Sequence, residues 1–541
     1  MKKSILPIII LAFQMFSSLN GVSQVPFMVK DINTGTASSS CSELTNVNGT
    51  LFFRANDGVN GLELWSSDGT TAGTILVKDI NPGTNISYPR NLIDINGTLF
   101  FSANDGVVGD ELWKSDGTAA GTVLVKDINA GSGDSYISAM VNGNGMLYFG
   151  ADDGINGYEL WKSDGTAAGT VMIKDINQGS GGSFPAFLTY INGTLYFRSN
   201  DGIAGDELWK SDGTTAGTVM VIDIYPGMNS SIYSYFTNVN GTLFFVADDG
   251  ISGRELWKSD GTNTGTVMVK DMNPGPSSSV PYYITNINGT IYLQASDGIN
   301  GAEPWISDGT TSGTVMLKDI KPGMFDSDPH FFTSLNGNVY FQAMDDTHGY
   351  ELWKSDGTAS GTSLVKDISP GLSPSEPNSF TAINNELYFS AAEPVYGIEL
   401  WQTDGTNLGT SLVMDIGVGP GSSVPNYLTN VNGTLFFLAS NQYGEELWAF
   451  HPPLVSVQEI SNNLIDLIVY PNPTTGKSNV SLSSGINLVQ IANLIGETVY
   501  TTSNSSHSTS CTLDLSELQK GIYILKVVSG NEYYFKKIIL N

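Results

Sequence analysis

Two short stretches of the sequence place carboxylate and imidazole side chains close together. They are residues 325–330 (FDSDPH) and residues 345–349 (DDTHG). Carboxylate oxygens suit calcium or manganese, and imidazole nitrogens suit zinc. If both stretches emerge on one face of the fold, they predict a divalent metal site, with calcium as its candidate ion. The candidate ligands are Asp326, Asp328, His330, Asp346 and His348. The alternative interpretation is that these are solvated polar loops.

Other residues with catalytic potential are sparse. The four histidines, His330, His348, His451 and His507, form no evident triad with a nucleophile. A glycosidase needs two carboxylates roughly 5–9 Å apart. Many acidic residues recur at equivalent positions along the chain, and such positions cannot by themselves define one active site. We therefore predict no enzymatic activity, and a hydrolase assembled from unrelated parts of the chain is the alternative.

Both acidic stretches belong to a repeat that occupies most of the chain. All nine tryptophans recur at a nearly constant spacing, beginning with Trp65, Trp113 and Trp161 and ending with Trp401 and Trp448. Nine aspartates in versions of a VKDI run keep the same spacing, from Asp31 to Asp415. A strict period of about 48 residues indicates one repetitive architecture instead of a series of unrelated domains.

Each repeat unit contains four expected strands joined by turns. In the first complete unit these are residues 44–47, 50–55, 62–67 and 74–80. The strands are rich in β-branched and aromatic residues, and the Asn48-Gly49 pair suits a two-residue hairpin turn. Four short antiparallel strands in a repeat of this length are typical of a β-propeller blade. The tryptophan of each unit is then expected to pack between neighbouring blades.

The two ends of the repeat region predict how the ring closes. The region opens with residues 27–32 (FMVKDI), a fourth strand without a preceding blade. It ends with residues 446–448 (ELW), a third strand with no VKDI run after it. If the N-terminal strand completes the last blade, the ring has about nine blades and no exposed sheet edge. Because propellers usually have four to eight blades, an eight-bladed ring or an open arrangement is the alternative.

The motif ELWKSDGT stands complete five times, at Glu111–Thr118, Glu159–Thr166, Glu207–Thr214, Glu255–Thr262 and Glu351–Thr358. With this motif, residues 24–450 resemble the ELWxxDGT repeat of secreted bacterial proteins. The resemblance implies a secreted protein and no particular ligand. In each SDGT turn, the aspartate is expected to accept hydrogen bonds from backbone amides of its own turn.

The N-terminus and the overall charge also bear on cellular address. Residues 1–23 read as a signal peptide, with Lys2-Lys3, an apolar run from Ile5 to Phe16, and small residues at Gly21 and Ser23. The formal net charge is −29, from 24 Lys and Arg against 53 Asp and Glu. Such a surface repels the phosphates of nucleic acids, so no nucleic-acid partner is expected.

After a linker at residues 451–463, the tail at residues 464–541 carries a second set of motifs. They are residues 469–476 (VYPNPTTG), 496–500 (GETVY), 521–527 (GIYILKV) and 536–539 (KKII). By the pattern of its strands alone, the tail is a small β-sandwich. With these motifs it resembles the type A C-terminal sorting domain of the type IX secretion system. The motif positions are Tyr470, Pro471, Asn472, Pro473, Gly476, Gly521 and Tyr523.

That resemblance implies export across the outer membrane of a Gram-negative bacterium. The type IX machinery and its sortase would then be partners, and the protein would be released or anchored to surface lipopolysaccharide after removal of the tail.

These features together predict an all-β, monomeric, secreted or cell-surface protein that binds a glycan or protein ligand, as an adhesin does, without catalysis. The long loops between blades and the turns between second and third strands are expected to share one face, where propellers usually carry function. Candidate side chains for stacking on a ligand are Tyr158, Tyr282, Tyr283 and Tyr350. A structural surface component without a specific ligand and a glycosidase-like hydrolase are the alternatives. The sequence leaves the identity of the ligand open.

Overall fold

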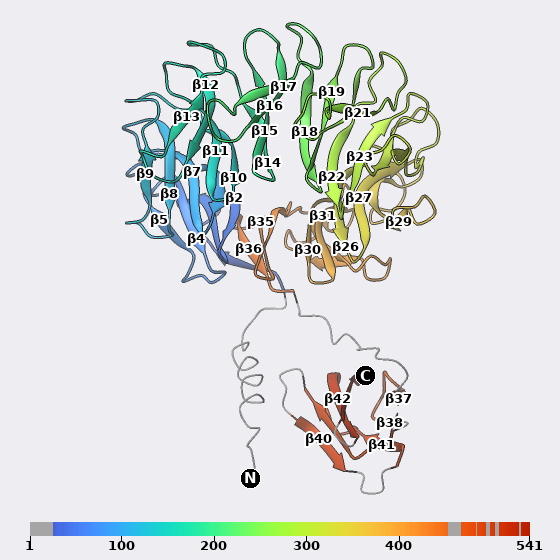
Figure 1. Ribbon diagram of the computed structural model, residues 1–541. Helices are drawn as coiled ribbons and strands as arrows, with labels where there is room; N and C mark the ends of the chain where they lie inside the picture. The colour runs from blue at the N-terminus through green and yellow to red at the C-terminus, as the bar shows by residue number, and fades with distance from the viewer. Residues whose placement is uncertain are drawn as a thin grey trace, which may run out of the picture. The chain divides into compact units, whose positions relative to one another are not determined.

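A computed structural model describes residues 25–452, 467–482, 484–493, 498–503, 508–529 and 532–540. The predicted signal peptide and most of the predicted linker lie outside these ranges. The chain divides into two compact units, residues 1–453 and residues 454–541, which we describe separately (Figure 1). Within the described ranges, no helix is long and apolar enough to cross a membrane.

The first unit is a propeller of nine four-stranded antiparallel sheets (Figure 1). We number the blades along the chain, so that blade one holds β2–β5 and blade nine holds β34–β36 together with β1. The first strands of the blades are β2 (Ser42–Val47), β6 (Arg90–Ile95), β10 (Ser138–Gly143), β14 (Ala186–Ile191), β18 (Ile232–Val239), β22 (Tyr282–Ile287), β26 (His330–Leu335), β30 (Asn378–Ile383) and β34 (Asn426–Val431). The second strands are β3 (Thr50–Asn56), β7 (Thr98–Asn104), β11 (Met146–Asp152), β15 (Thr194–Asn200), β19 (Thr242–Asp248), β23 (Thr290–Ser296), β27 (Asn338–Asp345), β31 (Glu386–Glu393) and β35 (Thr434–Asn441).

The third and fourth strands complete each sheet. The third strands are β4 (Leu62–Ser67), β8 (Asp110–Ser115), β12 (Tyr158–Ser163), β16 (Asp206–Ser211), β20 (Arg254–Ser259), β24 (Ala302–Ser307), β28 (Gly349–Ser355), β32 (Gly397–Thr403) and β36 (Gly444–Phe450). The fourth strands are β5 (Ile75–Lys78), β9 (Val123–Lys126), β13 (Val171–Lys174), β17 (Val219–Ile222), β21 (Val267–Lys270), β25 (Val315–Met316), β29 (Ser363–Lys366), β33 (Ser411–Met414) and, in blade nine, β1 (Phe27–Lys30).

The ring closes through the N-terminal strand, as the sequence predicts. Strand β1 pairs antiparallel with β36, with Phe27 opposite Ala449 and Met28 opposite Trp448. Val29 of β1 is buried at 1 % exposure. The first strand of each blade contacts the first strands of both neighbours, including β2 with β34, so nine first strands surround the centre. The prediction of nine blades with a closing N-terminal strand is confirmed.

The tryptophans pack between blades. Trp113 of blade two lies in one apolar cluster with Leu64 and Val77 of blade one. A lysine of the preceding blade covers each of seven tryptophan rings. Lys78, for example, lies 5.6 Å from the Trp113 ring centroid and donates a hydrogen bond to the Thr122 carbonyl at 2.8 Å. The lysine therefore ties two blades together by a cation–π contact and a charge-assisted hydrogen bond.

The glutamate of every ELW motif is buried and holds the loop that leads to the next blade. Glu63, for example, has no exposed surface. Its oxygens accept hydrogen bonds from the backbone N–H of Ile80 and of Ser87, at 2.8 and 3.0 Å, and from the Ser87 hydroxyl at 2.6 Å. Burial raises the pKa of Glu63 to about 7, while these donors act in the opposite direction. The motif is thus a structural device that fixes the position of each inter-blade loop.

The SDGT turn follows the expected pattern. Asp164 Oδ1 accepts hydrogen bonds from the Thr166 N–H at 2.8 Å and the Thr166 hydroxyl at 2.7 Å.

The long inter-blade loops lie against the turns between second and third strands. The backbone of Asn85 approaches Gly61 so closely that no side chain fits there, and Gly61 has φ of 73°. These two kinds of connection therefore share one face, as predicted.

The second unit is a small β-sandwich. One sheet has the order β37-β38-β41 and the other has the order β40-β39-β42-β43. Its strands are β37 (Ile468–Tyr470), β38 (Lys477–Ser481), β39 (Leu488–Ala492), β40 (Thr498–Ser503), β41 (Ser510–Asp514), β42 (Gly521–Ser529) and β43 (Glu532–Leu540). The apolar core joins both sheets, with Val480 and Leu513 from the first and Ile491, Leu525 and Ile538 from the second.

Candidate functional site

The predicted metal ligands of blade seven lie in separate polar groups. Asp328 accepts hydrogen bonds from the Tyr350 hydroxyl at 2.9 Å and from the Gln294 side-chain amide at 3.0 Å. Its Oδ1 lies 3.4 Å from His330 Nε2. Both carboxylate oxygens of Asp328 are therefore already engaged by neighbouring side chains.

In the second stretch, residues 345–349, the side chains pair within their own turn. His348 Nδ1 lies 2.8 Å from Asp345 Oδ2, and this contact raises the pKa of His348. Asp326 instead accepts a hydrogen bond from the backbone N–H of Ala302 at 2.7 Å. Among the described residues, no group of three or more His, Cys, Asp or Glu is placed to hold a metal ion. Asp328 and His330 lie together, but the structure does not gather the five candidate ligands into one cluster, so the metal site stays a prediction.

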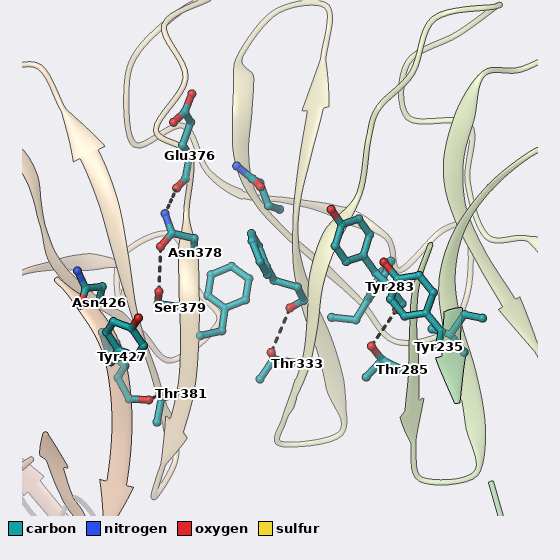
Figure 2. A pocket seen from close by; sticks show the side chains of 16 residues that line it. Tyr235, Tyr283, Thr285, Thr333, Glu376, Asn378, Ser379, Thr381, Asn426 and Tyr427 are labelled. Carbon is teal, nitrogen blue, oxygen red and sulfur yellow. Dashed lines mark hydrogen bonds between the residues drawn. The ribbon is translucent and has the colours of Figure 1, made fainter. Parts of the chain in front are cut away.

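A larger feature lies on the inner surface of blades five to nine. Residues of these blades, most of them in first strands, line a cavity of about 920 Å³ (Figure 2). Its aromatic wall carries Tyr235 from β18, Tyr283 from β22, Phe331 from β26 and Tyr427 from β34. Phe331 is 44 % exposed and Tyr427 is 53 % exposed, which is high for such large rings. The cavity therefore presents the rings of Phe331 and Tyr427 to solvent, inside the ring of first strands.

Polar side chains occupy the wall on blades eight and nine. Asn378 Nδ2 donates to the Glu376 carbonyl at 2.9 Å, and the Ser379 hydroxyl donates to Asn378 Oδ1 at 3.0 Å (Figure 2). Asn426 Oδ1 is buried and has no hydrogen-bond partner in the described part of the chain. Within the described ranges, Glu376 is the one carboxylate among the lining residues, and no lysine or arginine lines the cavity. The wall is thus almost uncharged, although the chain as a whole is strongly acidic.

The polar residues of blade seven support the aromatic wall. The ring of His330 lies edge-on to Tyr283 at a centroid distance of 4.5 Å. Burial raises the pKa of Tyr283. Burial and the hydrogen bond to Asp328 raise the pKa of Tyr350 to about 12, so both phenols are neutral at ordinary pH. His330 therefore packs directly against Tyr283, and Asp328 contacts His330.

The four tyrosines named from the sequence have different environments. Tyr283 lines the cavity. Tyr282, 37 % exposed, packs edge-on against Tyr235 at a centroid distance of 6.0 Å. Tyr158 stacks on Phe184 at 5.8 Å. The sequence reasoning missed Tyr235, Phe331 and Tyr427. Their signal was available, because each occupies the same position of its repeat unit as Tyr283 does.

In the tail, the sorting motif is partly built into the sandwich. Asn472 Nδ2 donates to the Lys537 carbonyl at 2.7 Å, and Asn472 Oδ1 accepts from the Ile539 N–H at 2.8 Å. The Tyr523 hydroxyl donates to the Gln519 carbonyl at 2.6 Å. Tyr470 is instead 72 % exposed. Asn472 thus ties the motif to strand β43, while Tyr470 is available at the surface.

Comparison with known proteins gives one family match and several distant structures. Residues 468–541 match the secretion system C-terminal sorting domain. No curated protein matches the chain. One similar structure is PorZ of Porphyromonas gingivalis, titled an essential bacterial surface component of the type-IX secretion system. It is 13 % identical, with a TM-score of 0.33, and the match covers 93 % of this chain and 75 % of that chain.

Two further structures have the same low level of similarity. The β-propeller domain of the Trilobed protease from Pyrococcus furiosus is 11 % identical, with a TM-score of 0.33, and the match covers 70 % of this chain and 98 % of that chain. A puromycin-hydrolyzing peptidase of Mycobacterium tuberculosis is 10 % identical, with a TM-score of 0.36, and the match covers 70 % of this chain and 62 % of that chain. At these scores the likeness carries no argument about function.

The family match and the fold together show a nine-bladed propeller followed by a secretion-system C-terminal sorting domain, which indicates export by type IX secretion.

Proposed function

We propose that the protein is a non-catalytic binding protein of the outer cell surface or the surrounding medium, and that it takes its ligand into the cavity on blades five to nine. Export depends on the tail and on the predicted signal peptide. The observation that supports this function most is the cavity of about 920 Å³, whose wall combines exposed aromatic rings with amide and hydroxyl groups. Binding sites for small ligands usually have this size and composition.

The chemistry of the cavity favours binding over catalysis. Hydrolysis of a glycoside needs a pair of carboxylates, and Glu376 is the one carboxylate among the lining residues that the structure describes. Nucleophilic hydrolysis needs a base within hydrogen-bond reach of a nucleophile. The Ser379 hydroxyl donates to the Asn378 amide oxygen, which is not a base.

Binding can be tested with one tyrosine pair in blade nine. Tyr427 lines the cavity, and Tyr443 lies in the turn between β35 and β36 at 40 % exposure. The full chain and its Tyr427→Ala and Tyr443→Ala variants are screened on arrays of glycans and extracellular matrix proteins. We expect saturable binding that Tyr427→Ala weakens and Tyr443→Ala leaves unchanged. No binding by the folded protein, or equal binding by all three forms, would overturn the proposal and favour a structural surface component.

A further inference from the structure

One position in each first strand has an uncommon backbone conformation. The nine residues occupy the same position of successive repeat units, and all of them have φ between 51° and 62°. They are Glu43, Asn91, Ala139, Phe187, Tyr235, Tyr283, Phe331, Ser379 and Tyr427. Each lies beside a shift in the pairing register with the second strand, as between Ser42 and Thr45 in blade one. This left-handed position is therefore part of a bulge that the fold repeats nine times.

The residue types at this position do not follow from the backbone alone. Glycine and asparagine adopt the left-handed conformation most readily, and bulky side chains adopt it at a cost. Blades one to three form the same bulge with Glu43, Asn91 and Ala139. Five of the remaining six blades carry an aromatic residue there, four of them in succession from Phe187 to Phe331. Because blades one to three form the same bulge without a ring, a cost that persists at five blades points to a role beyond the bulge itself.

The rings of Tyr235, Tyr283 and Phe331 form a continuous arc around part of the centre, and Tyr427 lies one blade beyond Ser379 on the same cavity. Ring centroids lie 6.3 Å apart between Tyr235 and Tyr283 and 6.2 Å apart between Tyr283 and Phe331. For Tyr283 and Phe331, the threonine two positions later donates a hydrogen bond to the carbonyl of the aromatic residue. Thr285 bonds the Tyr283 carbonyl at 2.9 Å and Thr333 bonds the Phe331 carbonyl at 3.1 Å (Figure 2). The backbone that carries the rings is thereby fixed before any ligand arrives.

The arc and its polar neighbours match one ligand class. A sugar ring presents an apolar face of C–H groups and an edge of hydroxyl groups. Aromatic faces suit the first, and the amides of Gln342, Asn378 and Asn426 suit the second because each can both donate and accept.

Other ligand classes fit the cavity less well. An anionic ligand would find no lysine or arginine on the wall as the structure describes it. An extended peptide that adds to a sheet needs an unbroken strand edge, and the register shift interrupts the first strand of each blade that carries the arc, as in β26 between His330 and Thr333. An uncharged, hydroxyl-rich ligand meets neither obstacle.

We propose that the arc formed by Tyr235, Tyr283 and Phe331, together with Tyr427 on the same wall, binds a neutral oligosaccharide, whose sugar rings stack on the aromatic faces. The proposal rests on the proposed binding function and assigns its ligand class. It also makes the aromatic residue at each bulge a compromise, favourable for binding and unfavourable for the backbone.

The test uses Tyr427→Asn and Phe331→Asn in the full chain, because asparagine already occupies the equivalent bulge at Asn91. Tyr443→Asn is the matched control outside the cavity. Probes are neutral hexasaccharides of glucose, mannose, xylose and galactose. A polygalacturonate, a hyaluronate oligosaccharide and a mixture of unstructured peptides serve as the charged and peptide probes. Calorimetric titration gives the affinity and thermal unfolding gives Tm.

We expect at least one neutral oligosaccharide to bind, with affinity reduced on the order of tenfold in each arc variant, the loss that about 1.4 kcal/mol produces. We expect Tyr427→Asn to keep or raise Tm, because the strained tyrosine is more than half exposed. The Tyr443→Asn control should bind as the unmodified chain does. A ring that served only the fold would give the reverse pattern, with lower Tm and unchanged affinity, and would overturn the proposal.

Two other results separate this proposal from the proposed function. Binding of only peptides or charged polysaccharides, lost in Tyr427→Asn, would overturn the neutral-glycan assignment and leave the binding site standing. Binding of a neutral oligosaccharide that neither arc variant weakens would overturn the arc as its site. No binding of any probe here or on the arrays would overturn both proposals.

Discussion

Each blade buries the glutamate two residues before its tryptophan, and Glu159 of blade three offers a sharp test of what that burial costs in free energy of unfolding. Its oxygens accept hydrogen bonds from the N–H groups of Ile176, Asn177 and Ser183, at 3.0, 3.2 and 3.0 Å, and from the Ser183 hydroxyl at 2.6 Å. Burial raises the pKa of Glu159 to about 6, and the four donors only partly offset it.

The raised pKa sets the sign and size of the effect. A folded chain with this pKa holds the proton more tightly than an unfolded chain, in which the carboxyl titrates near 4.5. The contribution of Glu159 to the free energy of unfolding is therefore fully present below the unfolded pKa and is lost as pH rises through the folded pKa. A difference of about 1.5 pH units corresponds to about 2 kcal/mol. In a chain of this length, that free energy changes Tm by about 2 °C.

The perturbation is Glu159→Gln, which keeps the shape and removes the titration. The amide places an NH₂ group opposite at least one backbone N–H, and a buried donor left unpaired costs about 1–3 kcal/mol. The variant should therefore melt below the unmodified chain at about pH 4. By about pH 7.5 the unmodified chain has lost its extra stability, so the gap in Tm should narrow by about 2 °C. Differential scanning calorimetry of the full chain at the two pH values measures this.

The matched control is Asp164→Asn in the same blade. Asp164 is exposed, and hydrogen bonds from Thr166 lower its pKa, the opposite direction to Glu159. The gap in Tm between this variant and the unmodified chain should therefore not narrow as pH rises. If the gap for Glu159→Gln instead stays constant or widens with rising pH, the four donors hold the carboxylate ionised, and the reasoning from burial is refuted.

Three further predictions follow from contacts elsewhere in the chain. Lys270→Met removes the ammonium 5.5 Å from the Trp305 ring centroid and should lower Tm by about 1 °C in calorimetry. An unchanged Tm would mean that the lysine–tryptophan contact between blades adds no stability. Val29→Asp buries an unpaired charge where the ring closes and should cost about 3–5 kcal/mol. Limited proteolysis should then cut near β1, and an equally resistant variant would speak against closure by this strand. Asn472→Ala removes hydrogen bonds to the Lys537 carbonyl and from the Ile539 N–H, and should destabilise the tail by about 2 kcal/mol. An unchanged melting transition of the tail, monitored beside a Tyr470→Ala control, would contradict that role.

The architecture of the protein could be predicted almost completely from its sequence. The constant period of the repeat, marked by tryptophans and VKDI runs, predicts the number of blades because each unit buries its faces only against its neighbours. The unpaired strand at residues 27–32 predicts the closure, because a ring without it would leave two open sheet edges. The tail motifs at residues 469–476 predict the sorting domain in the same way, from residues that are contiguous in the chain.

The candidate site was not recognised from the sequence, although its aromatic residues recur at one position of the repeat unit, because these residues meet only when the ring is closed. Tyr235 and Tyr427 lie four repeat units apart in the chain and line one cavity, since the curvature of the ring brings blades five to nine around a common space. The bulge that fixes the left-handed conformation of each is a property of strand pairing and has no fixed residue type, as Glu43 and Tyr283 at equivalent positions show. Conversely, Asp345 and His348 are close together in the chain and pair locally across their own turn. Sequence proximity thus indicated a metal site, and tertiary structure alone decided which side chains line the cavity.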